Sequence, residues 1–494
     1  MARSKVNSGA RYLPLGETIP AVTTELIASH AARHPSDIAV IDNNRKITYG
    51  EFYQDLGRFI RALGEFDLGV GGTAAIEWTS LYQHWLVLLA FETLGVATIT
   101  YEPEEIPEYW SRPIPIDLVI STSGNIPAGA GRVQKLTPSW INEILDTEPA
   151  EGRLRPDIDP DTPVRIHCSS GTTGDAKRMV RTARVHNFRV WQYQNKENYN
   201  RQSRYLVNGG FSIHAIYGRA TACIRSGGTC VNNTKGVLPT IREHGVTHAS
   251  FLPINLLRLL NNLPDNYVKA KNLTVSTFGA PLTETQRARI LHDFASNLIV
   301  SYGTNEVGSI CTINPDGTGT ILPGVSVEVV DDKDRPIMDQ PGSVRVKSDG
   351  CIDGYQGDPE ATLLMFRDGW FYPGDVGVMN DPHSLKLLGR ADALINFGGL
   401  KLNLAKIEES LRPITGIKDV CVTILTNAQG DEQIWIAFEL SPPTKLQDIK
   451  EAVSQRLSPN LGNLRTINLK KIPRTATGKV QLKKLNSLIL QSQK

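Results

Sequence analysis

The sequence predicts an α/β protein in which helices cover parallel sheets, followed by a smaller α+β domain. Helix-like and strand-like segments alternate through the first and middle thirds of the chain, which is typical of parallel sheets with helical crossovers. From 324 to 346 the pattern changes to short strands separated by Gly, Pro and Asp turns, which favours a small antiparallel barrel. A chain of 494 residues is too long for one hydrophobic core, so we expect two or three domains.

The first third provides the first helices and strands of this pattern. Apolar residues at helical spacing predict helices, and short apolar runs bounded by turn residues predict strands. The predicted helices are 24–34, 49–63 and 82–94, the last ending at Gly95, and the predicted strands are 38–41, 96–101 and 117–122.

The rest of the chain repeats the pattern and then changes character. An Asp- and Pro-rich connector at 156–163 leads into a strand at 164–168, after which we expect strands at 246–252 and 273–278 and helices at 255–263 and 283–294. After Arg390 a compact α+β pattern begins, with predicted helices 405–411 and 446–457 and strands 420–425 and 434–440. We therefore expect an N-terminal domain of residues 1–389 and a C-terminal domain of residues 390–494.

Composition limits the possible functions. The net charge is +2 with both signs interspersed, so we expect neither a nucleic-acid partner nor a polybasic membrane patch. The longest apolar stretch, 85–91, is too short for a transmembrane segment, and the polar start does not resemble a secretory signal. None of the six cysteines has metal-ligand spacing with another, as expected for reduced thiols in a cytoplasmic protein.

A loop rich in Gly, Ser and Thr follows the strand at 164–168 and has the composition of a phosphate-binding loop. Its glycines let the backbone approach an anion, its hydroxyls donate hydrogen bonds, and a lysine closes it. It is not a Walker loop, because Ala176 stands where the second glycine would be. A flexible surface turn is the alternative interpretation. The candidate phosphate-binding residues of the loop are Ser169, Ser170, Gly171, Thr172, Thr173, Gly174 and Lys177.

This loop resembles the phosphate loop of the adenylate-forming superfamily, which contains acyl- and aryl-CoA ligases, nonribosomal adenylation domains and firefly luciferase. Ala176 replaces the proline of the family pattern. Further segments of the same family follow in order along the chain. Together they extend the resemblance from about residue 20 to residue 485.

Two of these segments resemble the parts of the family that hold adenine and magnesium. The resemblance implies an adenine-contacting turn, a tyrosine that stacks on adenine and a glutamate that helps to hold Mg²⁺. A flat ring suits a base, and one carboxylate with phosphate oxygens suffices for Mg²⁺. Asn305 departs from the family pattern, and a solvated loop carboxylate is the alternative for Glu306. The candidates are Gly279, Ala280, Pro281, Tyr302, Gly303, Thr304 and Glu306.

The stretch from Gly354 to Asp375 resembles the longest motif of the family, which ends in an aspartate that binds both ribose hydroxyls. An ionised carboxylate suits a vicinal diol because each of its oxygens can accept one donor. Asp375 is therefore the candidate ribose ligand, and a simple turn aspartate is the alternative.

The C-terminal segments resemble the hinge, the thiol-tunnel loop and the catalytic segment of the family. The resemblance implies that Arg390 reaches ribose and phosphate and that Asp392 is the hinge of the small domain. It also implies a loop beside the thiol tunnel and a catalytic lysine, Lys479, that neutralises charge as pyrophosphate leaves. Taken alone, a lysine at this position is usually a solvated surface charge. The tunnel loop contains Gly398, Gly399 and Lys401.

The segment 211–218 resembles the region that lines the acid pocket of the family. Adenylation domains selective for α-amino acids carry an aspartate after the first aromatic residue, where this chain has Ser212. Because an unpaired ammonium group in a pocket is costly, we expect a non-amino acid. His214 is a candidate gate or catalytic residue, with an ordinary hydrogen-bonded histidine as the alternative. The pocket candidates are Phe211, Ser212, His214 and Tyr217.

The resemblance implies an α/β fold with a large N-terminal domain, made of two αβ layers and a small β-barrel, and a mobile α+β C-terminal domain. It also implies that ATP with Mg²⁺ activates a small carboxylic acid, and that a thiol then accepts the acyl group. CoA is the expected acceptor. A stand-alone enzyme that loads the phosphopantetheine of an acyl or peptidyl carrier protein is the alternative. A luciferase-like oxidase or a degenerate binding protein is a third hypothesis.

Overall fold

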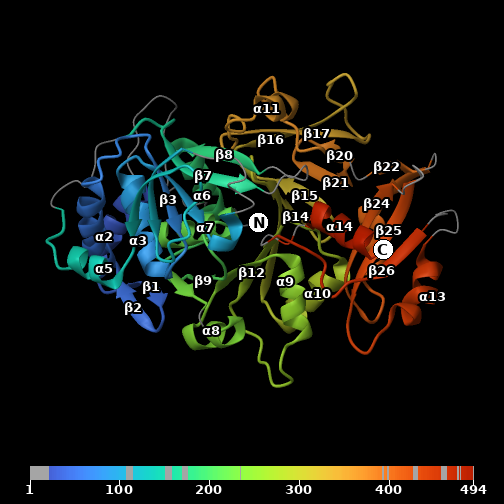
Figure 1. Cartoon of the computed structure of the whole chain (residues 1–494), viewed down its shortest axis with the longest axis horizontal. Helices are drawn as coiled ribbons and strands as arrows, with labels where there is room; N and C mark the ends of the chain where they lie inside the picture. The colour runs from blue at the N-terminus through green and yellow to red at the C-terminus, as the bar shows by residue number, and fades with distance from the viewer. Residues whose placement is uncertain are drawn as a thin grey trace, which may run out of the picture.

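The computed structural model describes residues 22–106, 115–150, 158–169, 176–233, 235–391, 394–397, 400–426, 432–457, 464–475, 478 and 480–492. Figure 1 shows α2 (Tyr49–Gly64) and α5 (Pro138–Leu145) at one end of the molecule and α13 (Leu446–Arg456) at the other, with α9 (Pro253–Asn261) and α10 (Glu284–Asp293) between them.

The first layer is a six-stranded sheet in the order β6-β5-β3-β4-β7-β8. Its first five strands pair in parallel, as the alternating pattern predicts, and β8 returns antiparallel to β7 as a hairpin. The strands are β3 (Thr73–Glu77), β4 (Ala97–Tyr101), β5 (Ile116–Ser121), β6 (Ala130–Lys135), β7 (Pro163–Ser169) and β8 (Lys177–Thr182).

The second layer begins with a parallel sheet in the order β13-β12-β11-β9-β10-β1, which β2 borders. Helices α6 (Ala183–Glu197) and α7 (His214–Arg225) link it to the first layer. Helix α6 contacts β7, β8 and β14, and α7 contacts β9 and β10. The strands are β1 (Ile38–Asp42), β2 (Arg45–Thr48), β9 (Arg204–Val207), β10 (Thr229–Asn232), β11 (His248–Phe251), β12 (Thr274–Phe278) and β13 (Asn297–Thr304), and α8 is Val237–His244.

The prediction of a small barrel after residue 324 is wrong for the described residues. The strands that follow β13 continue the second layer into one 15-stranded sheet, because β14 pairs antiparallel with Ser301–Thr304 of β13. A barrel needs every strand paired on both edges, whereas β16 pairs only with β17 among the described residues. The strands are β14 (Gly308–Ile313), β15 (Thr318–Ile321), β16 (Val325–Val330), β17 (Gly342–Ser348), β18 (Phe366–Arg367), β19 (Trp370–Phe371), β20 (Asp375–Asp381) and β21 (Ser384–Arg390).

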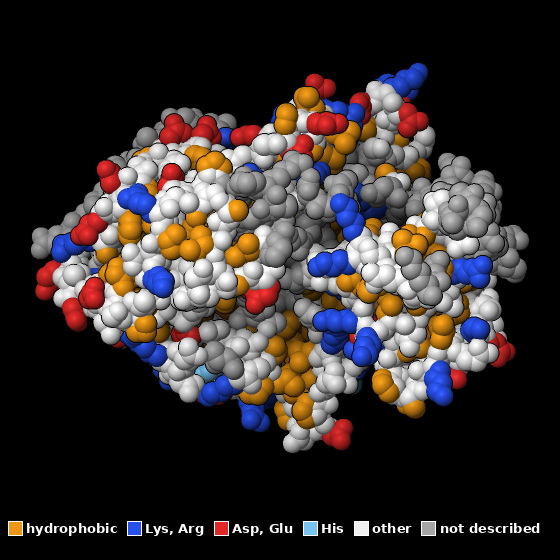
Figure 2. All heavy atoms as spheres, in the orientation of Figure 1, with side chains coloured by type: hydrophobic (Ala, Val, Ile, Leu, Met, Phe, Trp, Pro, Cys, Tyr) orange, Lys and Arg blue, Asp and Glu red, His pale blue; other side chains and the backbone are white. Residues whose placement is uncertain are grey.

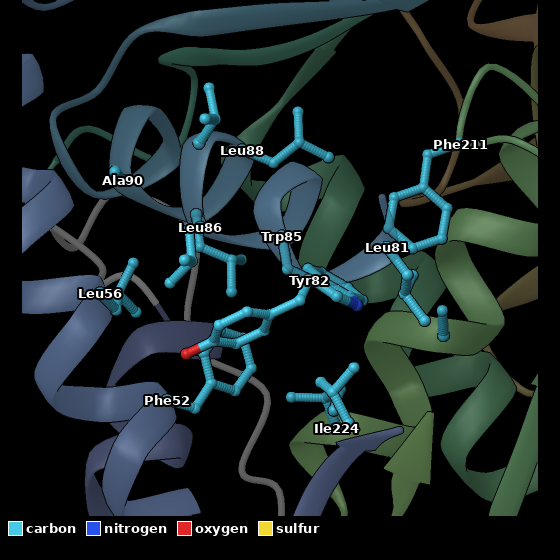
Figure 3. Packing of buried hydrophobic residues seen from close by; sticks show 14 of the residues in the cluster. Phe52, Leu56, Leu81, Tyr82, Trp85, Leu86, Leu88, Ala90, Phe211 and Ile224 are labelled. Carbon is cyan, nitrogen blue, oxygen red and sulfur yellow. The ribbon is translucent and has the colours of Figure 1, made fainter. Parts of the chain in front are cut away.

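The largest core cluster surrounds α3 (Leu81–Thr93), which is apolar on nearly every side and therefore buried all round. Ser80 caps its first turn by accepting a hydrogen bond from the amide of Gln83. Helix α2 (Tyr49–Gly64) packs beside it and begins with a capping box between Thr48 and Glu51. Figure 3 shows α2, α3 and α7 contributing side chains to one cluster. Helices α1 (Val22–Arg33) and α5 (Pro138–Leu145) also contact α2.

The C-terminal residues form the smaller α+β unit that the sequence predicts. A β22–β23 hairpin precedes a three-stranded sheet in the order β24-β25-β26. Two core clusters of this unit contain only residues after 403, so it has its own hydrophobic interior. Its elements are β22 (Leu394–Phe397), β23 (Leu400–Asn403), α12 (Leu404–Leu411), β24 (Ile417–Thr426), β25 (Glu432–Leu440), α13 (Leu446–Arg456), β26 (Leu464–Asn468) and α14 (Leu482–Gln491).

Both signs of charge appear on the face of the molecule that Figure 2 shows. Figure 2 shows acidic and basic side chains spread over the visible face, with apolar side chains between them. Within the described ranges, no helix is both long enough and apolar enough to span a bilayer. The expected lack of a nucleic-acid partner stays a prediction.

Trp85 provides a test of the α3 core. Its side chain has no exposed surface, so Trp85→Ala should lower the free energy of unfolding by about 3–5 kcal/mol. Urea denaturation followed by circular dichroism measures this change. Val268→Ala is the control, since Val268 is 85% exposed and its truncation should matter little. Equal midpoints for the two variants would contradict the assignment of Trp85 to the core.

Candidate active site

The β7–β8 hairpin positions the predicted phosphate loop. Ser169 ends β7 opposite Lys177, the first residue of β8, so the loop is the tip of the hairpin. Residues 170–175, which include the predicted ligands Ser170, Gly171, Thr172, Thr173 and Gly174, lie outside the described residues, as does the side chain of Ser169.

Lys177 and Glu306, predicted from separate motifs, meet through Tyr355. The Lys177 ammonium lies 4.5 Å from the centroid of the Tyr355 ring. The Tyr355 hydroxyl donates to Oε1 of Glu306 at 2.8 Å, and burial together with the Glu306 charge raises the pKa of this phenol. Tyr355 belongs to a motif that the sequence identifies, but its contact with Glu306 was not predicted. A cation and a half-buried carboxylate therefore lie near the tip of the hairpin.

Arg189 of α6 fixes the backbone that carries Glu306. Its guanidinium donates to the carbonyls of Asn305 at 2.9 Å, Glu306 at 2.6 Å and Gly350 at 2.7 Å. The side chain is only 1% exposed, and burial lowers its pKa to about 10. Sequence analysis missed this residue, because a single arginine in a helix gives no indication of distant carbonyl partners.

A second group of predicted nucleotide ligands lies on β13, β20 and β21. The Tyr302 hydroxyl donates to the carboxylate of Asp375, and burial with this neighbouring charge raises the Tyr302 pKa. Arg390 pairs in register with Asp375, and Nη1 lies 3.8 Å from Oδ1. Gly303 follows Tyr302, and a Cβ there would lie 2.2 Å from the Gly308 carbonyl, so only glycine fits.

The predicted adenine turn lies at the end of β12. Gly279 has φ +88, which favours glycine, and the following Ala280 and Pro281 are exposed. Thr304, the other predicted ligand, accepts a hydrogen bond from the Val307 amide. The turn is therefore exposed to solvent.

Leu252 connects this turn to the predicted catalytic segment. A Cβ at Gly279 would lie 3.4 Å from the Leu252 side chain, and a Cβ at Gly478 would lie 3.6 Å from Leu252 and from Ile254. The residue that precedes Lys479 therefore packs at the start of α9, close to the turn.

The predicted acid-pocket residues divide into core and cavity positions. Phe211 packs against Trp85 with ring centroids 4.9 Å apart, in the cluster drawn in Figure 3, and also lines a small cavity with Ser212. Ser212 donates to Oε1 of Glu105 at 3.2 Å. Tyr217 is buried and donates to Glu92 at 3.3 Å.

His214 lies at the start of α7 within a buried group of basic residues. Its Nδ1 is in hydrogen-bond contact with the Arg181 guanidinium, and its ring centroid lies 5.1 Å from that of His167. Burial and the neighbouring Arg181 lower the His214 pKa well below its usual value. We define the basic cluster as Arg165, His167, Arg181, His186 and His214. Sequence analysis missed all but His214, although basic residues at alternate positions of a buried strand were a visible signal.

Several predicted residues cannot be compared with the structure. Asp392, Gly398, Gly399 and Lys479 lie outside the described residues. Lys401 lies on β23, but its side chain is not described.

The family model described as AMP-binding enzyme matches residues 27–356, which is more than half of the chain. The chain belongs to this family. 4-Coumarate–CoA ligase 1 from Solanum tuberosum is 26% identical over 75% of this chain and 71% of that protein. The fatty acid–[acyl-carrier-protein] ligase MmaC from Mycobacterium marinum is 22% identical over 94% of this chain and 96% of its own length. These matches identify the chain as an AMP-forming acid–thiol ligase.

Solved structures share the fold over nearly the whole chain. ATP-bound MatB from Rhodopseudomonas palustris superposes with a TM-score of 0.82 at 19% identity, covering 96% of this chain and all of that one. O-succinylbenzoate CoA synthetase from Bacillus subtilis, solved with ATP and a magnesium ion, gives a TM-score of 0.77 at 19% identity, covering 93% of this chain and 99% of that one. At these identities the similarity shows the fold.

The Arg189 contacts predict a specific local effect. Arg189→Met leaves the carbonyls of Asn305, Glu306 and Gly350 without this donor, which should cost on the order of 3 kcal/mol. Hydrogen exchange of the amides at 303–308 should become faster. Arg335→Met is the control, because the Arg335 side chain is 69% exposed. Unchanged exchange in Arg189→Met would show that other contacts hold this loop.

Proposed function

We propose that this chain joins a small non-amino carboxylic acid to AMP and then transfers the acyl group to the thiol of CoA. One observation carries the proposal. Tyr302 and Glu306, four residues apart on the chain, each contact a residue of another predicted motif of the nucleotide site. Tyr302 meets Asp375, and Glu306 meets Tyr355 beside Lys177.

In the first half-reaction the acid carboxylate attacks the α-phosphorus of ATP, and pyrophosphate leaves. Asp375 accepts hydrogen bonds from the ribose, beside Tyr302 and Arg390, and the open turn at Gly279 contacts adenine. The hairpin-tip loop and Lys177 hold the phosphates. Lys479 bridges the attacking carboxylate and the α-phosphate as charge develops. The packing of Gly478 near the adenine turn supports this role.

Glu306 is the residue that would hold Mg²⁺. The structure supports this fit, because Oε1 accepts from Tyr355 while the other carboxylate oxygen accepts no hydrogen bond from the described residues. Mg²⁺ is commonly held by one or two carboxylates together with substrate phosphates. The ion would supply positive charge at the phosphate oxygens.

In the second half-reaction the thiol attacks the acyl carbon, and AMP leaves. We propose that the unit of residues 390–494 rotates about Asp392 relative to the unit of residues 1–389. This rotation removes Lys479 and brings the loop with Gly398, Gly399 and Lys401 to the pantetheine. The separate hydrophobic interior of the C-terminal unit supports such a rigid-body movement.

Loading of a carrier protein is the second candidate function. It is favoured by the similarity to MmaC, which is a fatty acid–[acyl-carrier-protein] ligase and matches this chain over more of its length than the coumarate ligase does. A phosphopantetheine thiol is present in both acceptors, so the two functions share one chemistry. We further propose that the enzyme acts in the cytoplasm.

Pyrophosphate exchange across a panel of acids tests the proposed activation. Non-amino carboxylic acids should support exchange better than α-amino acids, because Ser212 replaces a carboxylate that would pair with an ammonium group.

Asp375→Ala should weaken ATP binding by roughly tenfold or more, since hydrogen bonds to a charged acceptor contribute about 1.5–3 kcal/mol. Calorimetry measures that affinity. A proteinogenic amino acid as best substrate, or an unchanged ATP affinity, would contradict these assignments.

Single-turnover kinetics separate the two half-reactions. Lys479→Ala should slow acyl-adenylate formation by about a hundredfold or more, as the loss of one oxyanion donor does, while thiol transfer from supplied acyl-adenylate continues. Asp392→Pro should show the opposite effect, because proline fixes one hinge torsion. Equal losses in both steps for Lys479→Ala would disprove the two-conformation mechanism.

A further inference from the structure

The basic cluster contains a buried guanidinium, that of Arg181, for which the described part of the fold provides no carboxylate partner. Arg181 has no exposed surface, Arg165 is 2% exposed, and His167 and His214 are each 7% exposed. Buried charges are normally paired. Within the described ranges no ion pair of Arg181 is found, and the charges nearest to it include the guanidinium groups of Arg189 and Arg165.

The acidic groups near the cluster, Glu92 and Glu197, have partners other than Arg181. Glu92 accepts hydrogen bonds from Thr23 and Tyr217, and its carboxylate lies 3.8 Å from His186 of the cluster and 4.0 Å from Arg225. Glu197 accepts from Arg219 at 2.7 Å. Neither carboxylate contacts Arg181.

Most of the buried polar atoms of the cluster that lack a partner among the described residues are hydrogen-bond donors. A guanidinium can only donate, so Nδ1 of His214 accepts from Arg181 and the imidazole proton lies on Nε2. Nε2 of His214, and Nε and Nη2 of Arg181, have no partner in the described part of the chain. Nε of Arg165 and both ring nitrogens of His167 have none either. An anionic acceptor would satisfy these buried donors with strong, charge-assisted hydrogen bonds.

The cluster adjoins the predicted acid pocket. Arg165 and His167 line the same small cavity as Phe211 and Ser212, and Arg165 donates to the Phe211 carbonyl at 2.9 Å. Arg165 and Arg181 are register partners on β7 and β8, so both side chains lie on one face of the hairpin.

The same hairpin leads from the cluster to the phosphate loop. His167 lies three residues before the loop that begins at 170, which is about 10 Å along an extended strand. A group bound at the cluster can therefore belong to a small acid whose other end lies beside the phosphates of ATP.

We propose that the acid activated by this enzyme carries a second carboxylate, which Arg181 binds together with His167 and His214. This inference rests on the proposed function and specifies its substrate class as small dicarboxylic acids. The second carboxylate accepts the free donors of the cluster, while the first reacts with ATP. An acid with one carboxylate leaves those donors without an acceptor and binds more weakly.

The test compares each diacid with its own monomethyl ester in pyrophosphate exchange. Glutarate, adipate and terephthalate are suitable, because the ester keeps one reactive carboxylate and nearly the same size. For at least one pair, the diacid should give a kcat/KM about tenfold or more above that of its ester. Esters that react as well as all three diacids would overturn the proposal.

Arg181→Met then assigns the preference to the cluster. This variant should lose most of the advantage of the diacid while keeping activity toward the ester. Arg181→Lys should keep part of it, because the charge remains but the planar fork is lost. Arg201→Met, in which an exposed guanidinium is removed, should retain the wild-type preference. Equal loss of activity toward diacid and ester in Arg181→Met would indicate a structural role and contradict the proposal.

A binding measurement separates this proposal from the proposed function. In thermal shift and calorimetry without ATP, the preferred diacid should stabilise the wild-type protein and not Arg181→Met. If no acid supports exchange, the proposed function fails, while an Arg181-dependent diacid signal would still support the site. Stabilisation by inorganic phosphate or chloride equal to that by the diacid would show that a free anion fills the cluster, and would overturn the proposal.

The folding of the variants has its own control. Arg181→Met removes a buried charge without an ion pair, so the ligand-free protein should melt at the same or a higher temperature. Arg219→Met leaves Glu197 without its guanidinium partner and should melt at a lower temperature. A lower melting temperature for Arg181→Met, similar to that of Arg219→Met, would contradict the unpaired state of Arg181.

Discussion

The burial of α6 between the two sheets is the constraint on which the site depends. This helix contacts β7 and β8 of the first layer and β14 of the second. Its Arg189 binds the carbonyls of Asn305, Glu306 and Gly350, and its Lys196 donates to Ser301 and Ser309 of the second layer. Polar side chains in a dry interior hold a unique arrangement because each unmade bond is costly. The helix therefore fixes the distance between the phosphate-loop hairpin and the loop of Glu306.

The two groups of predicted nucleotide ligands follow from this arrangement. The hairpin of the first layer provides Lys177, and the second layer provides Tyr302, Glu306 and, through its antiparallel extension, Asp375 and Arg390. The extension matters because β14 continues the sheet at the end of β13, where Tyr302 and Gly303 lie. A separate closed barrel would leave that edge unpaired. The continuous sheet instead brings Asp375 to Tyr302.

The basic cluster differs from the positively charged residues of the proposed ATP site in its burial. Chemistry at the proposed ATP site requires positive charge near phosphates, and half-buried Lys177 and exposed Arg390 are suited to it because water can still reach them when no ligand is bound. Arg181 and His214 are different, since burial removes that solvation. Keeping such groups is costly to stability, and natural proteins accept that cost mainly where function needs it. In our proposal, the function that justifies this cost is the selection of an acid with a second carboxylate.

Much of the architecture and most ligand candidates could be predicted from the sequence because they depend on local patterns. Apolar periodicity predicted α2, α3 and α10, and the loop composition around Gly171 and the motif at 302–306 provided the candidates for the nucleotide site. The barrel prediction failed because local turns and short strands do not specify which edge a strand pairs with. That choice was decided by β13, which is adjacent to β14 only after the parallel sheet has formed.

Sequence alone determined the family, the order of the motifs and the residues that we propose bind the nucleotide. Only the tertiary structure decided that Tyr355 contacts Glu306, that Arg189 holds the loop carbonyls and that Arg181 lies beside His214. The physical reason is the range of the interactions. Periodicity and turns act within a few residues, whereas these hydrogen bonds join segments 33 to 117 residues apart, and their burial depends on the packing of both layers.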